Sequence, residues 1–166
     1  MSTWDVIRNT IATEFSDLGS AQEITQLLVR LLVASFLGGC LGLERELQGK
    51  PAGIRTHMLV GCSSALIILV PVQMGFDGEA LSRVLQGLLA GIGFLCAGAI
   101  LKLEREEQVH GLTTAASVWM TAAIGIAAGL GREMTAALAT LIVLFILWLE
   151  GPLTRMGLRK SQDNES

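Results

Sequence analysis

Apolar residues along the chain gather into five long runs that are separated by short polar segments. The runs cover Ile24–Leu43, Met58–Gly75, Val84–Leu101, Leu112–Leu130 and Met134–Leu149. A helix that crosses about 30 Å of hydrocarbon needs roughly 20 apolar residues. Five consecutive runs near that length predict an all-α membrane protein with five transmembrane helices. A transmembrane β-barrel is excluded, because its strands alternate apolar and polar residues rather than running apolar throughout.

The segment that precedes the first run has a different pattern. Its apolar residues recur every three or four positions, at Trp4, Ile7, Ile11, Phe15 and Leu18. This spacing places them on one face of a helix. Such an amphipathic helix suits the membrane interface, and packing on the outer surface of the bundle is the alternative. The segment does not resemble a signal peptide, because its acidic residues outnumber its one arginine.

Composition supports a membrane location. Of the 166 residues, 51% are hydrophobic and 16% are charged, whereas a soluble domain has about a quarter charged residues. The five runs together contain one charged residue, Arg30. We therefore divide the chain into an interfacial segment (1–23), a five-helix membrane domain (24–150) and a short cytoplasmic tail (151–166). The net charge of −3 and the absence of a basic stripe argue against nucleic acid as a partner.

Lysine and arginine are distributed unevenly between the two sides of the membrane. The first loop, the third loop and the tail contain eight of them, whereas the N-terminal segment and the other two loops contain three. Positively charged loops remain in the cytoplasm. The sequence therefore predicts a multi-pass protein with its N-terminus outside and its C-terminus in the cytoplasm.

Small residues spaced by four occur in three of the predicted spans. The glycine pairs with this spacing are Gly38 and Gly42, Gly87 and Gly91, and Gly125 and Gly129. Small residues one turn apart let the backbones of neighbouring membrane helices approach closely. We therefore expect Gly91 and Gly125 at helix contacts, with a functional kink or a permeation surface as the alternative.

The loop between the first two runs is the densest in chemically active side chains. These are Glu44, Arg45, Lys50, Arg55, Thr56 and His57. Three cations in one tight loop can bind lipid phosphates or the carboxylates of a partner, so the loop is a candidate partner- or anion-binding site. The alternative is a positively charged anchor whose cations pair internally with Glu44 and Glu46.

Arg30 lies on the same helical face as Ala34 and Gly38. Charges inside membrane spans usually face the bundle or water. The alternative is a side chain that extends along the helix to the outer interface.

The fourth run opens with Gly111, Thr113 and Thr114. Hydroxyl groups at a helix start can cap its free amides, so we expect Thr113 and Thr114 to cap this helix. Binding of an anion by the same groups is the alternative.

Three motifs in order resemble the signatures of the MgtC/SapB family of bacterial inner-membrane proteins. The first comprises Gly42–Glu46 and Gly49–Val60. The second comprises Arg83 and the segment 91–100, with Gly91, Gly93, Phe94 and Gly98. The third comprises Gly111–Trp119 and Thr121–Gly125. The resemblance extends from about Arg30 to Gly129 and implies a location in the bacterial inner membrane.

The family resemblance implies a link to growth in low magnesium, to virulence and to inhibition of the F-type ATP synthase through membrane contacts. Many such proteins carry a soluble C-terminal domain, so we expect this chain to be a member that has the membrane domain only. Neither a cofactor nor a metal site is expected.

These features predict a non-enzymatic regulator that contacts another membrane complex, such as the F-type ATP synthase, and that can form a homo-oligomer. The alternative is a transporter or channel for magnesium or another ion. The spans contain no Asp or Glu, which disfavours a magnesium site inside the membrane because magnesium prefers oxygen ligands that include carboxylates.

Overall fold

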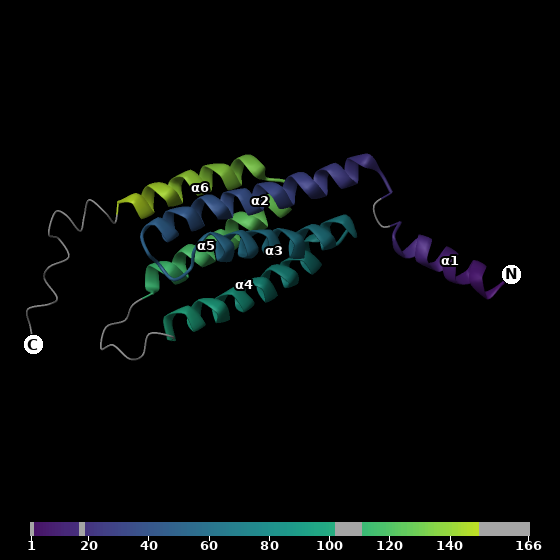
Figure 1. Cartoon of the computed structure of the whole chain (residues 1–166), viewed down its shortest axis with the longest axis horizontal. Coiled ribbons are helices and arrows are strands. Elements are labelled where there is room, and N and C mark those ends of the chain that lie inside the picture. The colour runs from purple at the N-terminus through teal and green to yellow at the C-terminus, as the bar shows by residue number, and fades with distance from the viewer. Residues whose placement is uncertain (1, 17–18, 102–110, 150–166) are drawn as a thin grey trace, which may run out of the picture.

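The computed structural model describes residues 2–16, 19–101 and 111–149. Within these residues the chain forms six helices and no strands. The helices are α1 (Thr3–Glu14), α2 (Ala21–Leu47), α3 (Ile54–Gln73), α4 (Gly78–Leu101), α5 (Leu112–Gly129) and α6 (Glu133–Trp148). Figure 1 shows α2 to α6 side by side in one bundle, with α1 beyond the start of α2. The predicted tail, 151–166, lies outside the described residues.

The first two helices begin with the same local motif. Ser2 and Ser20 are the N-cap residues, and Asp5 and Glu23 complete reciprocal capping boxes with them. The Ser20 hydroxyl accepts a hydrogen bond from the Glu23 amide at 3.1 Å, and the Glu23 carboxylate accepts one from the Ser20 amide at 3.3 Å. These bonds satisfy amides that have no partner within the helix.

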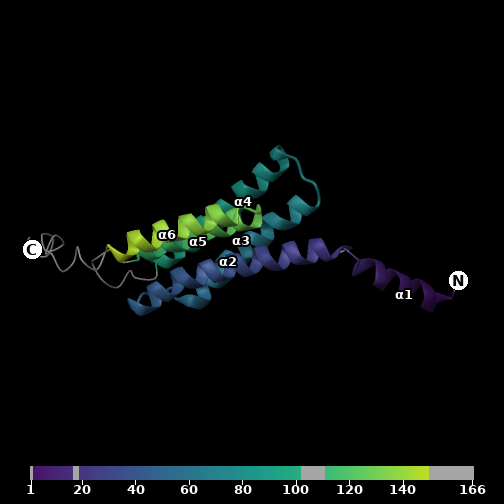
Figure 2. The same cartoon turned by 90° about the horizontal axis from the view of Figure 1, so that it is seen from above.

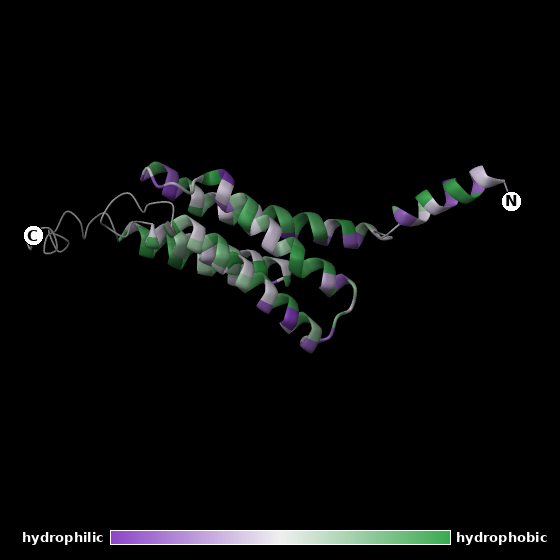
Figure 3. Ribbon diagram, turned by 90° about the horizontal axis from the view of Figure 1, so that it is seen from below, coloured by the Kyte–Doolittle hydropathy of each residue, from purple (hydrophilic) through white to green (hydrophobic). Residues whose placement is uncertain are grey.

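The expected all-α membrane architecture is confirmed. Helices α2 to α5 are long and apolar enough to cross a membrane, and α6 is a shorter apolar helix of 16 residues. Figure 3 shows polar residues concentrated in α1 and towards the ends of the longer helices. Helices α2 and α3 extend beyond their apolar runs, so Arg45, Arg55 and His57 belong to helices rather than to a loop.

Helix α5 occupies the centre of the bundle. It packs against α2, α3, α4 and α6, whereas the backbones of α2 and α4 do not approach each other closely. In Figure 2 α2 and α4 lie on opposite sides of the molecule. Consistent with this position, ten of the 18 residues of α5 are buried.

Glycine permits the closest of these helix contacts. A Cβ atom added at Gly125 would lie 2.4 Å from the carbonyl oxygen of Gly61, and one at Gly129 would lie 2.5 Å from that of Ala65. A Cβ atom at Gly61 would lie 2.7 Å from the carbonyl oxygen of Ala34. The backbones of α2, α3 and α5 can therefore approach this closely only because these positions lack side chains.

Candidate functional site

Polar side chains are buried between α2, α3 and α5. They begin at the end of the bundle where α2 ends and α3 and α5 begin, and they continue towards its middle. Each is at most 3% exposed, and together they are Arg45, Ser64, His57, Thr114, Ser117 and Thr121. We call these six residues the buried polar cluster. Buried polar groups in an apolar bundle are costly unless they bond to one another or to the backbone, so their grouping makes this region the candidate site.

Helical periodicity aligns the members of the cluster. On α3, the cluster members His57 and Ser64 lie on one face, with Gly61 between them at spacings of four and three residues. On α5, Ser117 and Thr121 are spaced by four residues. Residues three or four apart lie on one helical face, so the α3–α5 interface contains a line of hydroxyl groups that leads away from His57.

Two glycines of α2 bring the first turn of α3 into this site. A Cβ atom at Gly38 would lie 2.5 Å from the carbonyl oxygen of His57, and one at Gly42 would lie 2.6 Å from Cα of Ile54. Both positions therefore lack the side chain that would push α3 outward. The sequence motif that includes Gly42 and His57 thus encodes one packed helix pair.

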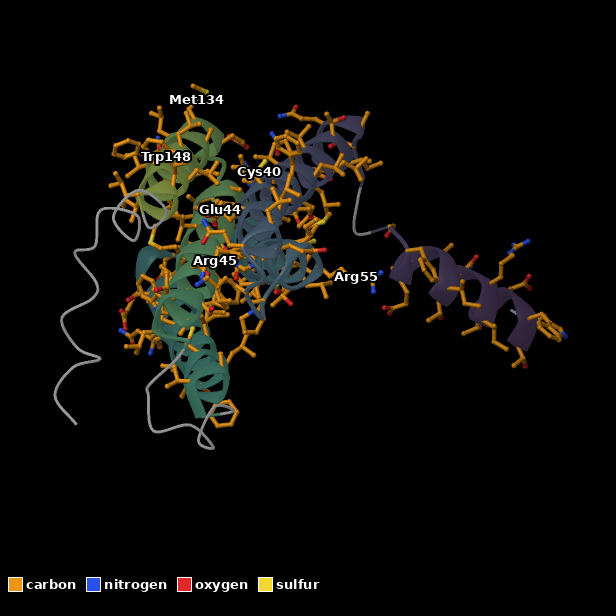
Figure 4. The ribbon with its side chains drawn as sticks, turned by 60° about the vertical axis from the view of Figure 1, so that its left-hand side comes forward. Cys40, Glu44, Arg45, Arg55, Met134 and Trp148 are labelled. Atoms are coloured by element: carbon orange, nitrogen blue, oxygen red, sulfur yellow. The ribbon has the colours of Figure 1, made fainter. Side chains whose placement is uncertain are left out.

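Arg45 is the charged member of the cluster. Its side chain is completely buried in the last turn of α2, and its Nη1 atom lies 3.9 Å from Oε2 of Glu44. Figure 4 shows Arg45 directed among the helices, whereas Arg55 points away from them. A guanidinium group keeps its charge when buried and requires compensating groups, and Glu44 supplies one such contact.

His57 connects α3 to α5. Its Nδ1 atom lies 3.0 Å from the carbonyl oxygen of Gly53, and its Nε2 atom lies 3.3 Å from the hydroxyl of Ser117. A carbonyl oxygen can only accept, so Nδ1 carries the proton that makes the first bond. In neutral His57, Nε2 is therefore an acceptor for the hydroxyl of Ser117.

The Ser117 hydroxyl has one proton and two acceptors within reach. Besides Nε2 of His57, it lies 2.8 Å from the carbonyl oxygen of Thr114. Neutral His57 therefore competes with Thr114 for this proton, whereas a doubly protonated ring would donate to Ser117 and leave its proton to Thr114. The hydrogen-bond pattern of the cluster thus depends on the protonation state of His57.

The acidic residues in the last turn of α2 make local contacts. The N-cap residue of α3 is Gly53, which has no side chain to cap the helix, and the Ile54 amide donates instead to the Glu46 carboxylate at 3.0 Å. The side-chain amide of Gln48 donates to Glu44. These bonds fix the turn between α2 and α3.

The residues predicted as one binding loop are separated by the structure. Arg45 and His57 are buried, Lys50 is half-buried, and Arg55 and Thr56 are exposed on the first turn of α3. Of these five, only Arg55 and Thr56 are exposed, so they are the most accessible of the predicted binding residues.

The expected caps at the start of α5 are wrong. The N-cap residue is Gly111, with φ of +91°, and no side chain among the described residues caps this helix. Thr113 is exposed, whereas Thr114 is buried and its carbonyl oxygen accepts from Ser117. Glycine adopts the left-handed conformation without steric penalty, which explains its place here.

Arg30 joins α2 to the turn between α5 and α6. Its Nη1 atom donates to the carbonyl oxygen of Gly129 at 3.2 Å, and its Nε atom lies 3.9 Å from Oε1 of Glu133. The side chain is 19% exposed. Arg30 therefore faces the bundle, where its charge also complements the partial negative charge at the C-terminal end of α5.

Helix α4 presents glycines outward. The spacing of Gly87, Gly91, Phe94 and Gly98 places them on one face, which we call the α4 glycine face. A Cβ atom at any of these three glycines, or at Gly93, would meet nothing within 4 Å in the described part of the chain, and Phe94 is 82% exposed. The close contact expected for Gly91 is therefore not met within these residues.

Arg83 lies near the start of α4 and outside the buried polar cluster. It is exposed and pairs with Glu79 of the same helix at 2.8 Å. Exposed pairs of this kind contribute little to stability.

Sequence reasoning missed Ser64, Ser117 and Thr121. Each is a hydroxyl residue inside an apolar run, and such residues are common in membrane helices. The signal that could have found them is their spacing from His57 and from one another. Among residues 2–16, 19–101 and 111–149, no group of three His, Cys, Asp or Glu side chains is arranged to hold a metal ion.

The chain is similar to several known proteins. The pattern that defines the MgtC family matches residues 31–156. Relatives include SrpB of Synechococcus elongatus, 43% identical over 71% of this chain and 71% of SrpB. YhiD of Escherichia coli, named for a proposed role in magnesium transport, is 36% identical over 74% of this chain. MgtC of Salmonella typhimurium is 38% identical over 70% of this chain.

The extent of these matches differs between the relatives. The aligned region covers 59% of YhiD and 49% of MgtC, so the chain spans about half to three-fifths of the length of these two proteins. No solved structure matches the chain significantly.

Proposed function

Because this chain belongs to the MgtC family, we propose that it is a non-enzymatic membrane protein of magnesium homeostasis that acts by binding another membrane complex through its helices. The name of YhiD, which refers to magnesium transport, supports the link to magnesium. The resemblance to the family makes the F-type ATP synthase the first complex to test.

The observation that carries this proposal is the α4 glycine face. In the described part of the chain its glycines have open space around them, in contrast to Gly125 and Gly129, which lie against backbone atoms of α3. Because three positions of this face are glycines, a foreign membrane helix can approach the backbone of α4 there and gain van der Waals contact. The exposed ring of Phe94, between Gly91 and Gly98, adds a large apolar group to the same face.

The proposal is tested by co-purification from native membranes in mild detergent, followed by mass spectrometry. Wild-type protein is expected to retain a stoichiometric membrane partner. Gly91→Leu is expected to lose that partner while its protein level and thermal stability stay normal, because the position has free space. Ala116→Leu is the matched control, since it adds bulk at an exposed position of α5.

Two results would contradict the proposal. Retention of the partner by Gly91→Leu would show that the α4 glycine face is not the contact. Recovery of a homo-oligomer alone from wild-type membranes would show that the protein does not bind another membrane complex. It would favour the second candidate function.

That second candidate is ion transport. It is favoured by the buried line of hydroxyl groups between α3 and α5, where the hydroxyl of Ser64 has no hydrogen-bond partner among the described residues. Against it stands the buried cation Arg45, which repels cations entering from its end of the bundle. The test is uptake of magnesium by proteoliposomes that contain the purified chain. Uptake by the wild type that is lost in Ser64→Leu would establish transport instead of regulation.

A further inference from the structure

The apolar face of α1 is covered by no other part of the described chain. Trp4, Ile7, Ile11 and Phe15 form this face, and Trp4 and Phe15 are 77% and 84% exposed. None of α2 to α6 packs against α1, and Figures 1 and 2 both show it away from the bundle. This excludes packing on the bundle within the described residues. Leu18, expected on the same face, lies outside them.

The position of α1 in the chain keeps it close to a membrane. Helix α2 is a candidate membrane span that begins at Ala21, and six residues separate it from Glu14, the last residue of α1. Even fully extended, such a linker reaches only about 20–25 Å. A tether this short keeps α1 at a high effective concentration next to the bilayer surface.

The length and charge of α1 determine how it can interact with lipid. Its 12 residues correspond to a rise of about 18 Å, too short to cross the hydrocarbon. Its charged residues are Asp5, Arg8 and Glu14, and Arg8 lies 4.0 Å from Asp5. The charges sum to −1, so attraction to anionic lipids does not drive binding, and burial of apolar side chains must do so.

We propose that α1 lies along the bilayer surface, at the membrane face where α2 begins, with Trp4, Ile7, Ile11 and Phe15 inserted between the lipid headgroups and the upper acyl chains. The opposite face, with Asp5, Asn9 and Thr13, remains in water. Tryptophan favours this depth because its ring is amphipathic. This placement requires α1 to turn from the axis of α2 into the plane of the membrane.

Trp4 is a direct probe of this placement. The chain has three tryptophans, so Trp119→Phe with Trp148→Phe leaves Trp4 alone in the full chain. In phosphatidylcholine proteoliposomes, bromine on the acyl chains is expected to remove roughly half of the Trp4 emission, and shallow bromine more than deep bromine. Replacing part of the lipid with phosphatidylglycerol is expected to leave the quenching unchanged.

A pair of variants tests the face itself. Ile11→Asp places a charge on the apolar face and is expected to expose Trp4 to aqueous iodide and to shift its emission to the red. Asn9→Asp adds the same charge on the opposite face and is expected to change neither.

Two outcomes would overturn the proposal. Quenching of wild-type Trp4 by iodide but not by bromolipid would place α1 in water. A blue-shifted emission that bromolipid does not quench and that depends on protein density would mean that a second copy covers the face. Both readouts are independent of the proposed function.

Discussion

At the scale of single residues, glycines with the same spacing in different helices have opposite surroundings. A Cβ atom at Gly125 would collide with the backbone of α3 at 2.4 Å, whereas one at Gly91 would meet nothing within 4 Å among the described residues. Backbone atoms cannot move aside as the end of a flexible side chain can. A single added methyl group therefore distinguishes a packing glycine from one on an outer face.

Gly125→Ala is expected to lower the stability of the protein by about 1–3 kcal/mol, because overpacking forces the α3–α5 interface apart. Gly91→Ala is expected to be neutral or stabilising by up to about 1 kcal/mol, since alanine favours the helix over glycine. Thermal unfolding in detergent, followed by size-exclusion chromatography, measures both. Equal midpoints for the two variants would contradict the packing described for Gly125.

The two arginines of the first family motif are also expected to differ. Arg45 is completely buried and Arg55 is exposed. Arg45→Lys is expected to destabilise the protein by about 1–3 kcal/mol, because lysine cannot reproduce the planar fork of donors in a buried site. Arg55→Lys should leave the unfolding midpoint unchanged, so any loss of partner binding in that variant would reflect recognition at the surface.

At the scale of helices, Arg30 links α2 to the end of α5 and the start of α6. Arg30 makes two polar contacts with this turn, one with the Gly129 carbonyl and one with the Glu133 carboxylate. Gly131 in the turn has φ of +74°, and a Cβ atom there would lie 2.6 Å from Nη2 of Arg30. The turn is thus shaped around the guanidinium group.

Arg30→Leu is expected to loosen this turn, because the last carbonyl groups of α5 lose a charged donor. Hydrogen–deuterium exchange should become faster, on the order of tenfold, in a peptide covering residues 127–133. Arg83→Leu is the control, since Arg83 is exposed and pairs only within α4 among the described residues. Unchanged exchange in Arg30→Leu would mean that the α5–α6 turn is stable without it.

The helices themselves were predictable from the sequence, because each apolar run is nearly free of charge. Their ends were less so. Helix α3 begins at Ile54, four residues before the run starts at Met58, because Glu46 from the preceding helix caps the Ile54 amide. That contact crosses a loop and has no signature in the apolar pattern. Gly91 and Gly125 likewise belong to glycine pairs with the same four-residue spacing. Their surroundings differ because α4 lies at the edge of the bundle and α5 at its centre.

At the scale of the whole molecule, the membrane orientation is a prediction that rests on the distribution of Lys and Arg. In a background without Cys40, Cys62 and Cys96, Gln48→Cys should be labelled only from the cytoplasmic side. Asp77→Cys, at the other end of α3, should be labelled only from outside. Both positions are exposed, and an impermeant maleimide added to intact cells and to inverted vesicles measures their sidedness. The reverse pattern would invert the predicted orientation.

The central position of α5 has a consequence for how the protein is made. Helices leave the ribosome in chain order, so α2, α3 and α4 enter the membrane before the helix that packs against all three. Until α5 arrives, His57 lacks the hydroxyl of Ser117, and α3 lacks the helix that covers its polar face. Because no earlier helix can replace α5, the bundle closes late in synthesis, and a chain truncated before Leu112 would expose its polar residues to membrane quality control.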